Sequence, residues 1–151
     1  MCKQIQKKMK TRILASGTGS TPFQRLLGHN SSLLEGWVSL EESFYSQTAL
    51  DEELLEQVRR VLAHGNKCAY CMAKGKPRQE GLNNRESLAT AFAELFLLDH
   101  LSINEGHFDV LREAFSEKEI LELCAYICFT TSSQRLGAIL NLTPDALDKS
   151  A

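Results

Sequence analysis

The sequence predicts an all-α fold in a single domain. Apolar residues recur at helical spacing along most of the chain, only three prolines occur in 151 residues, and no stretch alternates β-branched with polar residues as a half-buried strand does. A hydrophobic content of 43% and a charged content of 24% are typical of a globular protein with one buried core. We expect residues 1–21 to form a basic segment and a flexible joint, residues 22–142 the helical domain, and residues 143–151 a C-terminal tail.

Each helix expected in the first half of the chain begins at a residue that can cap it. Pro22 suits the first position of a short helix, with Ser20 and Thr21 before it as cap candidates. Asn30 is expected to open a second helix and Asp51 a third, because Asn and Asp side chains accept hydrogen bonds from free backbone N–H groups. The third helix should be interrupted at Gly65. Its apolar stripe consists of Leu54, Leu55, Val58, Val61 and Leu62.

The second half of the chain follows the same pattern after a break at residues 75–77. Asn83 or Asn84 is expected to open a long helix, and a short helix should follow over about residues 105–115. Ser116 and Glu119 have the spacing of a capping box. The helix that they open has apolar groups on nearly every side, so we expect it to be buried all round, in a core or between subunits. Its apolar residues are Ile120, Leu121, Leu123, Cys124, Ala125, Ile127, Cys128 and Phe129. Thr143 should start a last short helical piece.

Composition and charge argue against several classes of partner. A net charge of −2 provides no field for holding nucleic acid or a membrane surface. The basic opening, residues 3–12, resembles either a nucleic-acid-binding arm or a solvated terminus, and we favour the terminus because the chain has no second basic patch. No apolar segment follows these charges as in a secretory signal. Five cysteines that are not spread as a secreted disulfide framework favour a cytoplasmic location.

Cys68-Ala-Tyr-Cys71 is the most informative stretch of the sequence. Gly65 and Asn66 place a helix start at about Lys67, where free N–H groups favour the thiolate form of a nearby cysteine. One sulfur of such a pair can attack a peroxide or a disulfide, and the other can resolve the product. The pair is therefore a redox centre, half of a zinc site, or two inert thiols, and we favour the redox centre.

The zinc interpretation needs two more ligands. Cys124 and Cys128 share a helix face at a spacing of four residues and could complete a site with four thiolates. They lie among Ile, Leu and Phe, however, and cysteine is often buried as a small hydrophobic residue. We therefore predict that these two cysteines pack in the core and that the protein has no metal site.

Several segments in order resemble one protein family. They are residues 23–29 (FQRLLGH), 50–56 (LDEELLE), 68–71 (CAYC), 81–82 (GL), 115–120 (FSEKEI) and 134–136 (QRL). Over about residues 22–142 the chain resembles the carboxymuconolactone decarboxylase superfamily, in its alkylhydroperoxidase D (AhpD)-like, peroxidase-related branch. The resemblance implies a helical fold that forms homo-oligomers, a two-cysteine peroxidase or disulfide reductase activity without a cofactor, a hydroperoxide substrate, and a protein or small dithiol as electron donor.

The resemblance also assigns roles to individual residues. Cys71 would attack the peroxide, Cys68 would resolve the sulfenic acid, and Glu56, twelve residues before Cys68, would relay protons. Active members of the branch carry a histidine four residues after the second cysteine, but this position is Gly75 here, and so a low rate is expected unless another group replaces it. His64 is one candidate for that replacement.

Each of these assignments has a simpler alternative. Lys74 could lower the pKa of the Cys71 thiol, and His64 could fold back toward it, but both also suit solvated surface positions. Glu56 lies nearly opposite the apolar stripe of its helix, and a surface ion pair with Arg60 explains it equally well.

Three functions follow, in decreasing order of preference. The first is an antioxidant enzyme that reduces hydroperoxides or exchanges disulfides through Cys68 and Cys71. The second is a lyase similar to carboxymuconolactone decarboxylase, which is disfavoured because that branch works without a Cys-x-x-Cys pair. The third is a non-catalytic helical oligomer whose thiol pair responds to redox conditions.

Overall fold

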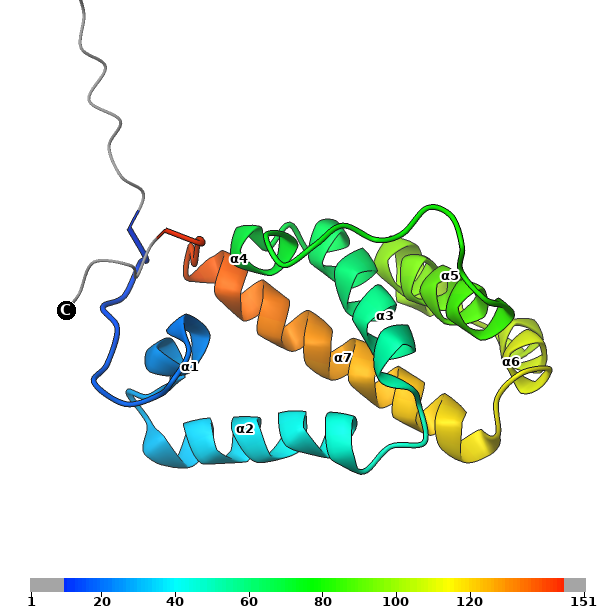
Figure 1. The fold of residues 1–151 in the computed structure, drawn as a ribbon, viewed down its shortest axis with the longest axis horizontal. Helices are drawn as coiled ribbons and strands as arrows, with labels where there is room; N and C mark the ends of the chain where they lie inside the picture. Colours follow the sequence, from blue (N-terminus) through cyan, green and yellow to red (C-terminus); the bar gives the residue numbers. More distant parts are fainter. Residues whose placement is uncertain (1–9, 146–151) are drawn as a thin grey trace, which may run out of the picture.

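The structure is a computed structural model that describes residues 10–145. All the regular secondary structure within these residues is helical (Figure 1). The all-α fold expected from the sequence is thus confirmed. The helices are α1 (Pro22–Leu27), α2 (Ser31–Ser46), α3 (Glu52–Gly65), α4 (Ala69–Met72), α5 (Asn84–Asp99), the short 3₁₀ helix η1 (His100–Ser102), α6 (Glu105–Arg112) and α7 (Glu117–Ile139).

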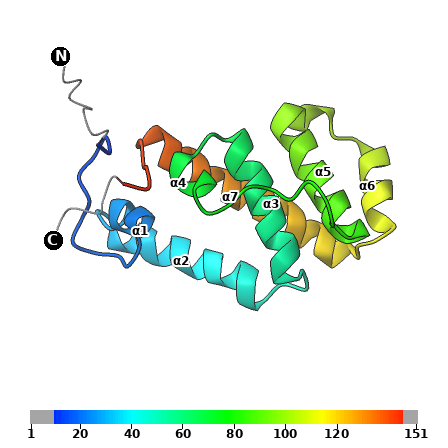
Figure 2. The same cartoon turned by 45° about the horizontal axis from the view of Figure 1, so that its top comes forward.

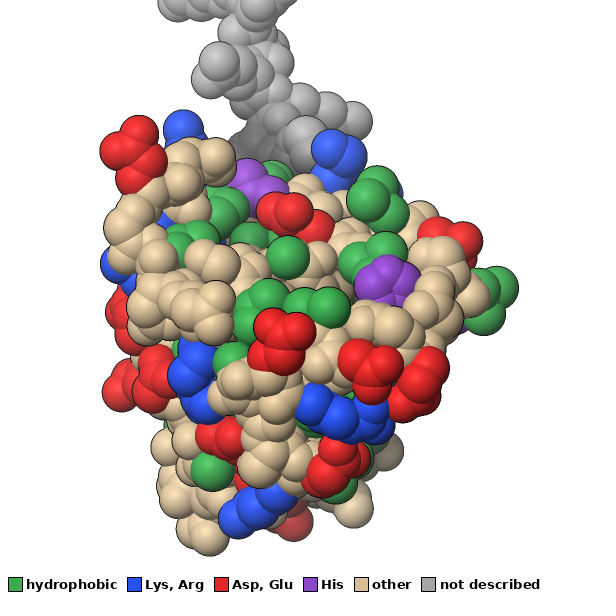
Figure 3. Space-filling model, turned by 90° about the vertical axis from the view of Figure 1, so that its right-hand side faces the viewer, with side chains coloured by type: hydrophobic (Ala, Val, Ile, Leu, Met, Phe, Trp, Pro, Cys, Tyr) green, Lys and Arg blue, Asp and Glu red, His purple; other side chains and the backbone are tan. Residues whose placement is uncertain are grey.

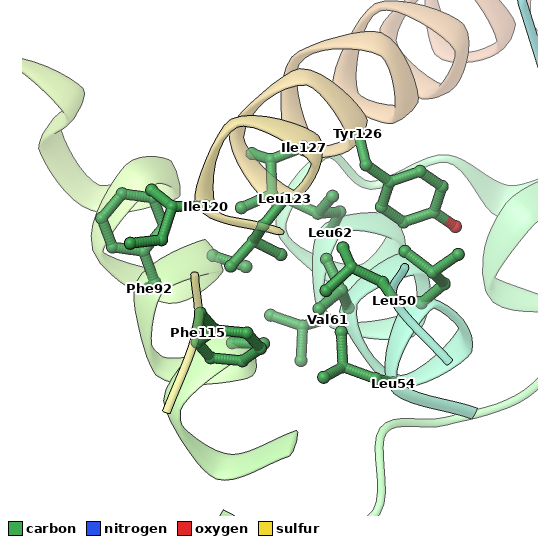
Figure 4. Packing of buried hydrophobic residues seen from close by; sticks show 14 of the residues in the cluster. Leu50, Leu54, Val61, Leu62, Phe92, Phe115, Ile120, Leu123, Tyr126 and Ile127 are labelled. Carbon is green, nitrogen blue, oxygen red and sulfur yellow. The ribbon is translucent and has the colours of Figure 1, made fainter. Parts of the chain in front are cut away.

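Helices α3 and α7 form the centre of the molecule. Helix α7 runs diagonally through the fold, α3 packs on it and on α5, and the short helix α4 lies beside the C-terminal half of α7 (Figures 1 and 2). Side chains from α3, α5 and α7 meet in one hydrophobic core, which Figure 4 shows from close by. Because α3 and α7 both belong to this core, they form a rigid base for the loop and the short helix that carry the two cysteines.

The helix starts agree closely with the capping residues in the sequence. Thr21, Asn30 and Asp51 accept hydrogen bonds from the third residue of α1, α2 and α3 respectively. Asn83 and Ser116 open α5 and α7 with complete capping boxes, in which a Glu side chain also bonds back to the cap residue. These local hydrogen bonds satisfy backbone donors that would otherwise be unpaired at each helix start.

The sequence predicted that α7 is buried on all sides, but one side of this helix is exposed. Leu121 is 68% exposed and Ile139 is 63% exposed, whereas Leu123 and Ile127 are almost completely buried. The reason is geometric: within this one chain, α3 and its neighbours cover one face of α7 and leave part of the opposite face open. An apolar groove between α2 and α7 runs along that open side, and Cys128 is one of the residues that line it.

Segments near both ends of the described chain make their own contacts or turns. Residues 16–21, expected as a flexible joint, are tied to α1: the Ser16 N–H donates to the Arg25 carbonyl over 2.8 Å. The Arg12 N–H donates to the Leu140 carbonyl over 2.8 Å, so residues 10–12 lie against the end of α7. Residues 144 and 145 form a turn, so the helix start expected at Thr143 is not present within the described residues. Most of the basic opening and the last six residues lie outside the described residues.

The charged surface is mixed in sign. Figure 3 shows acidic and basic side chains interspersed on the face that includes α5 and α6. On α6, for example, Arg112 forms salt bridges with Glu105, Asp109 and Glu117 at 2.7 to 3.0 Å. Among residues 10–145, no helix combines the length and the apolar character that crossing a membrane requires.

Candidate redox-active site

The two cysteines of the Cys-x-x-Cys stretch are joined in a disulfide, with their Cα atoms 5.2 Å apart. Asn66 ends α3, and Lys67 then adopts a left-handed conformation (φ = 52°) that reverses the chain direction. Cys68 is the capping residue of α4, so the helix starts at Ala69, two residues later than the sequence indicated. This tight turn brings the two sulfurs together at the junction of α3 and α4.

The two sulfurs have very different surroundings. Cys68 is completely buried beneath α7. A Cβ atom added to Gly137 of this helix would lie 3.2 Å from the Cys68 Sγ atom. Cys71 is partly exposed and lines a cavity of about 140 Å³. Access to the disulfide from this cavity is therefore through Cys71.

The cavity is built from five helices and the loop after α4. It is bounded by aromatic side chains, with charged and hydroxyl groups between them. Its lining consists of Thr21, Phe23, Gln24, Glu41, Tyr45, Arg59, Tyr70, Cys71, Lys74, Tyr126, Phe129, Thr130, Ser133 and Gln134.

Two tyrosines that line the cavity, one from α2 and one from α7, share a hydrogen bond. The Tyr45 and Tyr126 hydroxyl oxygens are 3.1 Å apart, and Tyr126 is only 2% exposed. Burial is the main cause that raises the pKa of both phenols, and for Tyr126 the neighbouring Tyr45 raises it further. Both hydroxyls therefore stay protonated at neutral pH, and one of the two protons lies in the hydrogen bond between them while the other remains free to donate.

Arg59 connects Glu56 to the cysteine segment. The Glu56 carboxylate accepts hydrogen bonds from Arg59 at 2.7 and 2.8 Å and from Arg60 at 2.8 Å. Arg59 also donates to the main-chain carbonyl of Cys71 over 3.1 Å. Burial would raise the pKa of Glu56, but the hydrogen bonds from the two arginines outweigh it and lower the pKa. The Glu56 carboxylate is thus held ionised in an ion-pair network, and Arg59 connects it to the cysteine segment. The role of Glu56 as a proton relay stays a prediction.

Two positions bear on the missing histidine: Gly75, where the resemblance places it, and His64, the candidate replacement. The Nδ1 atom of His64 lies 3.0 Å from the main-chain oxygen of Arg60, so this nitrogen is engaged within α3. Gly75 has φ = 136°, and a Cβ atom there would lie 2.9 Å from the Arg60 guanidinium carbon. Arg60 therefore fills the space next to the position where the resemblance implies a histidine. A catalytic role for His64 stays a prediction.

Lys74 and Glu41 are the ionisable side chains that line the cavity together with Arg59, Cys71 and the tyrosines. The Lys74 Nζ atom is 4.7 Å from the centre of the Tyr70 ring. Although much of the Lys74 side chain is exposed, partial burial lowers its pKa, and the positive charge of Arg59 lowers it further. Burial raises the pKa of Glu41, with the charge of Lys74 acting in the opposite direction.

Sequence reasoning missed the contribution of α2 and α7 to this site. Glu41 and Tyr45 are four residues apart on α2, a spacing that places both on one helix face. That spacing was a usable signal, but it does not indicate which other helix this face meets. Tyr126 was part of an apolar run and carried no signal of its own.

The remaining cysteines within residues 10–145 are free thiols on α7. The prediction that both pack in the core is wrong for Cys128, which is exposed in the groove between α2 and α7. Cys124 is half-buried against the core, and burial is the main cause that raises its pKa. In the same part of the chain, no group of three or more His, Cys, Asp or Glu side chains is arranged to hold a metal ion.

The fold can be compared with that of known proteins. No protein-family model matches the chain, and no curated protein matches it either. A similar fold occurs in the crystal structure of an uncharacterized peroxidase-related protein from Silicibacter sp. TM1040. The TM-score is 0.69 at 19% sequence identity, over 82% of this chain and 75% of that chain. The chain thus has the helical fold of a peroxidase-related protein, with a disulfide-bonded cysteine pair at the junction of α3 and α4.

Proposed function

We propose that this protein is a thiol-dependent hydroperoxide reductase that cycles Cys68 and Cys71 between dithiol and disulfide. The observation that carries the proposal is the unequal access to the two sulfurs: Cys71 lines the cavity, and Cys68 is completely buried beside it. Attack on a peroxide needs an accessible sulfur, whereas resolution needs only a neighbouring thiol. Support also comes from the peroxidase-related structure with the same fold.

The reaction can be written in three balanced steps. The Cys71 thiolate attacks one oxygen of the hydroperoxide, the O–O bond breaks, and the alkoxide that leaves takes up a proton to become an alcohol. The Cys68 thiol then condenses with the Cys71 sulfenic acid, which releases water and forms the disulfide found in the structure. A dithiol donor returns two electrons and two protons through a mixed disulfide and is itself oxidised.

The cavity wall supplies hydrogen-bond donors for this chemistry. Tyr45, Tyr126 and Arg59, whose side chains carry such donors, all line the cavity into which Cys71 opens. Such donors stabilise an anionic sulfur before attack and the negative charge that develops on the leaving oxygen during it. The same groups would serve a thiolate that exchanges with the disulfide of a partner protein.

Consumption of cumene hydroperoxide with dithiothreitol as reductant tests the proposal. We expect the wild type to consume the peroxide and Cys71→Ser to lose this activity. Cys128→Ser is the matched control, because Cys128 is an exposed free thiol on the far side of α7 from the disulfide, in the α2–α7 groove. Turnover in Cys71→Ser at the rate of the wild type would refute the proposal.

The same preparation separates peroxide reduction from disulfide exchange. The protein is first reduced and freed of dithiothreitol, and then mixed with one equivalent of cumene hydroperoxide or of oxidised glutathione. Rapid formation of the Cys68–Cys71 disulfide with the peroxide supports the proposal. Rapid formation with oxidised glutathione alone would replace it with a disulfide oxidoreductase activity.

A further inference from the structure

The cavity beside Cys71 contains a lysine and a carboxylate that the thiol chemistry above leaves without a role. Lys74 follows Cys71 by three residues, and its main-chain N–H donates to the Cys71 carbonyl over 3.3 Å. Glu41 reaches the same cavity from α2. The two side chains therefore come from segments distant in sequence and meet at the cavity that Cys71 lines.

The other candidates for proton exchange are engaged elsewhere. Glu56 is held by two arginines, and one nitrogen of His64 bonds to the main chain of α3. Arg59 lines the cavity but does not release its proton in the accessible pH range. Tyr45 and Tyr126 have pKa values raised by burial, so they donate hydrogen bonds but do not act as bases near neutral pH.

We propose that Lys74 exchanges the proton of Cys71 during peroxide reduction and that the negative charge of Glu41 stabilises the Lys74 ammonium beside the thiolate. The inference rests on the proposed function, since it assigns the acid and base of that reaction. The neutral amine of Lys74 takes the thiol proton as the Cys71 thiolate forms. The resulting ammonium then gives this proton to the alkoxide as the O–O bond breaks, so that Lys74 returns to its initial state and an alcohol leaves.

The surroundings of Lys74 suit this exchange. Arg59 from α3 adds positive charge beside it, Glu41 from α2 adds negative charge, and Tyr70 from α4 presents its ring to the ammonium. Partial burial lowers the pKa of Lys74, so its ammonium releases a proton more readily than that of a solvated lysine.

The first test measures the thiol and needs no peroxide. The reduced protein is alkylated with iodoacetamide across pH 5 to about 10, a range that brackets the ordinary thiol pKa, and mass spectrometry follows the peptide that contains Cys71. We expect Lys74→Met to slow alkylation at pH 7 about tenfold, because loss of a neighbouring cation raises a thiol pKa by about one pH unit. Lys74→Arg keeps the charge and should remain close to the wild type. Lys76→Met, whose side chain does not line the cavity, is the control.

The second test measures turnover of cumene hydroperoxide. Lys74→Arg cannot release a proton, so we expect its turnover to fall about a hundredfold even though its thiol reacts normally. Glu41→Gln should also lower turnover, and Glu42→Gln, its neighbour outside the cavity lining, should not.

The two proposals fail in different ways. A wild type that consumes no peroxide refutes the proposed function, while alkylation still reports on Lys74. Alkylation of Cys71 in Lys74→Met that matches the wild type at every pH overturns the inference, as does Lys74→Arg turnover equal to that of the wild type. Slow alkylation in Lys74→Met, together with low turnover in Lys74→Arg, supports it.

Discussion

The Arg59 guanidinium donates a hydrogen bond to the main-chain carbonyl of Cys71 over 3.1 Å, so a charged side chain of α3 holds the short helix that carries the accessible sulfur. The same guanidinium binds Glu56 through two further nitrogens. Helix α4 has only four residues, and a helix of this length has little stability of its own. Contacts such as this one therefore fix the position of Cys71 relative to the cavity.

Replacing Arg59 with Met tests how much this anchor contributes to stability. The variant leaves the Cys71 carbonyl without this donor and removes one cation from Glu56, so we expect the free energy of unfolding to fall by about 2 kcal/mol. Urea denaturation followed by circular dichroism measures it. Arg135→Met is the control, because Arg135 is exposed and its loss should cost about 0.5 kcal/mol or less. Equal losses in both variants would contradict the anchoring role.

The close approach of α7 to Cys68 can be tested with a pair of glycines. Gly137 and Gly36 both lie inside helices, where alanine is normally more stable by about 0.5 to 1 kcal/mol. A Cβ atom at Gly36 meets nothing within 4 Å, but one at Gly137 would lie 3.2 Å from the Cys68 sulfur. We therefore expect Gly36→Ala to stabilise the protein and Gly137→Ala to destabilise it by about 1 kcal/mol.

Thermal and urea unfolding of the oxidised proteins measure this difference. A similar gain in stability for both alanine variants would mean that α7 can shift away from the sulfur without cost. The same variants should differ after reduction, too, if Cys68 remains packed against α7 as a free thiol.

Introducing a histidine at Gly75 is expected to fail as a repair of the site. The residue has φ = 136°, a conformation that side chains with a Cβ rarely adopt, and the Arg60 guanidinium occupies the adjacent space. Gly75→His should therefore lower the free energy of unfolding by about 1 to 3 kcal/mol and should not raise peroxide turnover. Gly75→Ala separates backbone strain from the size of the side chain. An increase in turnover with unchanged stability would contradict this account.

The sequence predicted the local features of this fold much better than its long-range contacts. The capping residues Asn30, Asp51 and Ser116 act on backbone groups three positions away, so their patterns identify helix starts directly. The ion pair of Glu56 with Arg60 likewise follows from their spacing of four residues on one helix.

The residues that line the cavity could not be predicted from local spacing in the sequence. Glu41 and Tyr45 are on α2, and they line one cavity with Tyr126 and Cys71 only because α2, α4 and α7 come together in the folded chain. The exposed side of α7 has the same origin, since a run of apolar residues does not say how many neighbours a helix will have. Packing between helices decides both features.

The pH dependence of stability provides a last test, at the start of α7. Two hydrogen bonds lower the pKa of Glu119 from 4.5 to about 2: the main one comes from Arg85 and the next from the Ser116 backbone N–H. A carboxyl group whose pKa is lower in the folded protein stabilises the fold above its unfolded value, and this contribution disappears as the pH falls toward the folded value. The stabilisation should thus be complete above about pH 5 and should be lost between about pH 4.5 and 2.

Glu119→Gln isolates the charge, because glutamine can still complete the capping box with Ser116. We expect this variant to be less stable than the wild type by about 1 to 2 kcal/mol at pH 7, and the difference to shrink as the pH falls below 4.5. Urea unfolding at several pH values measures this difference. In an Arg85→Met background the main partner of the carboxylate is gone, so the effect of Glu119→Gln should be smaller and less dependent on pH. If the pH dependence is the same in both backgrounds, then the ion pair with Arg85 does not cause the low pKa.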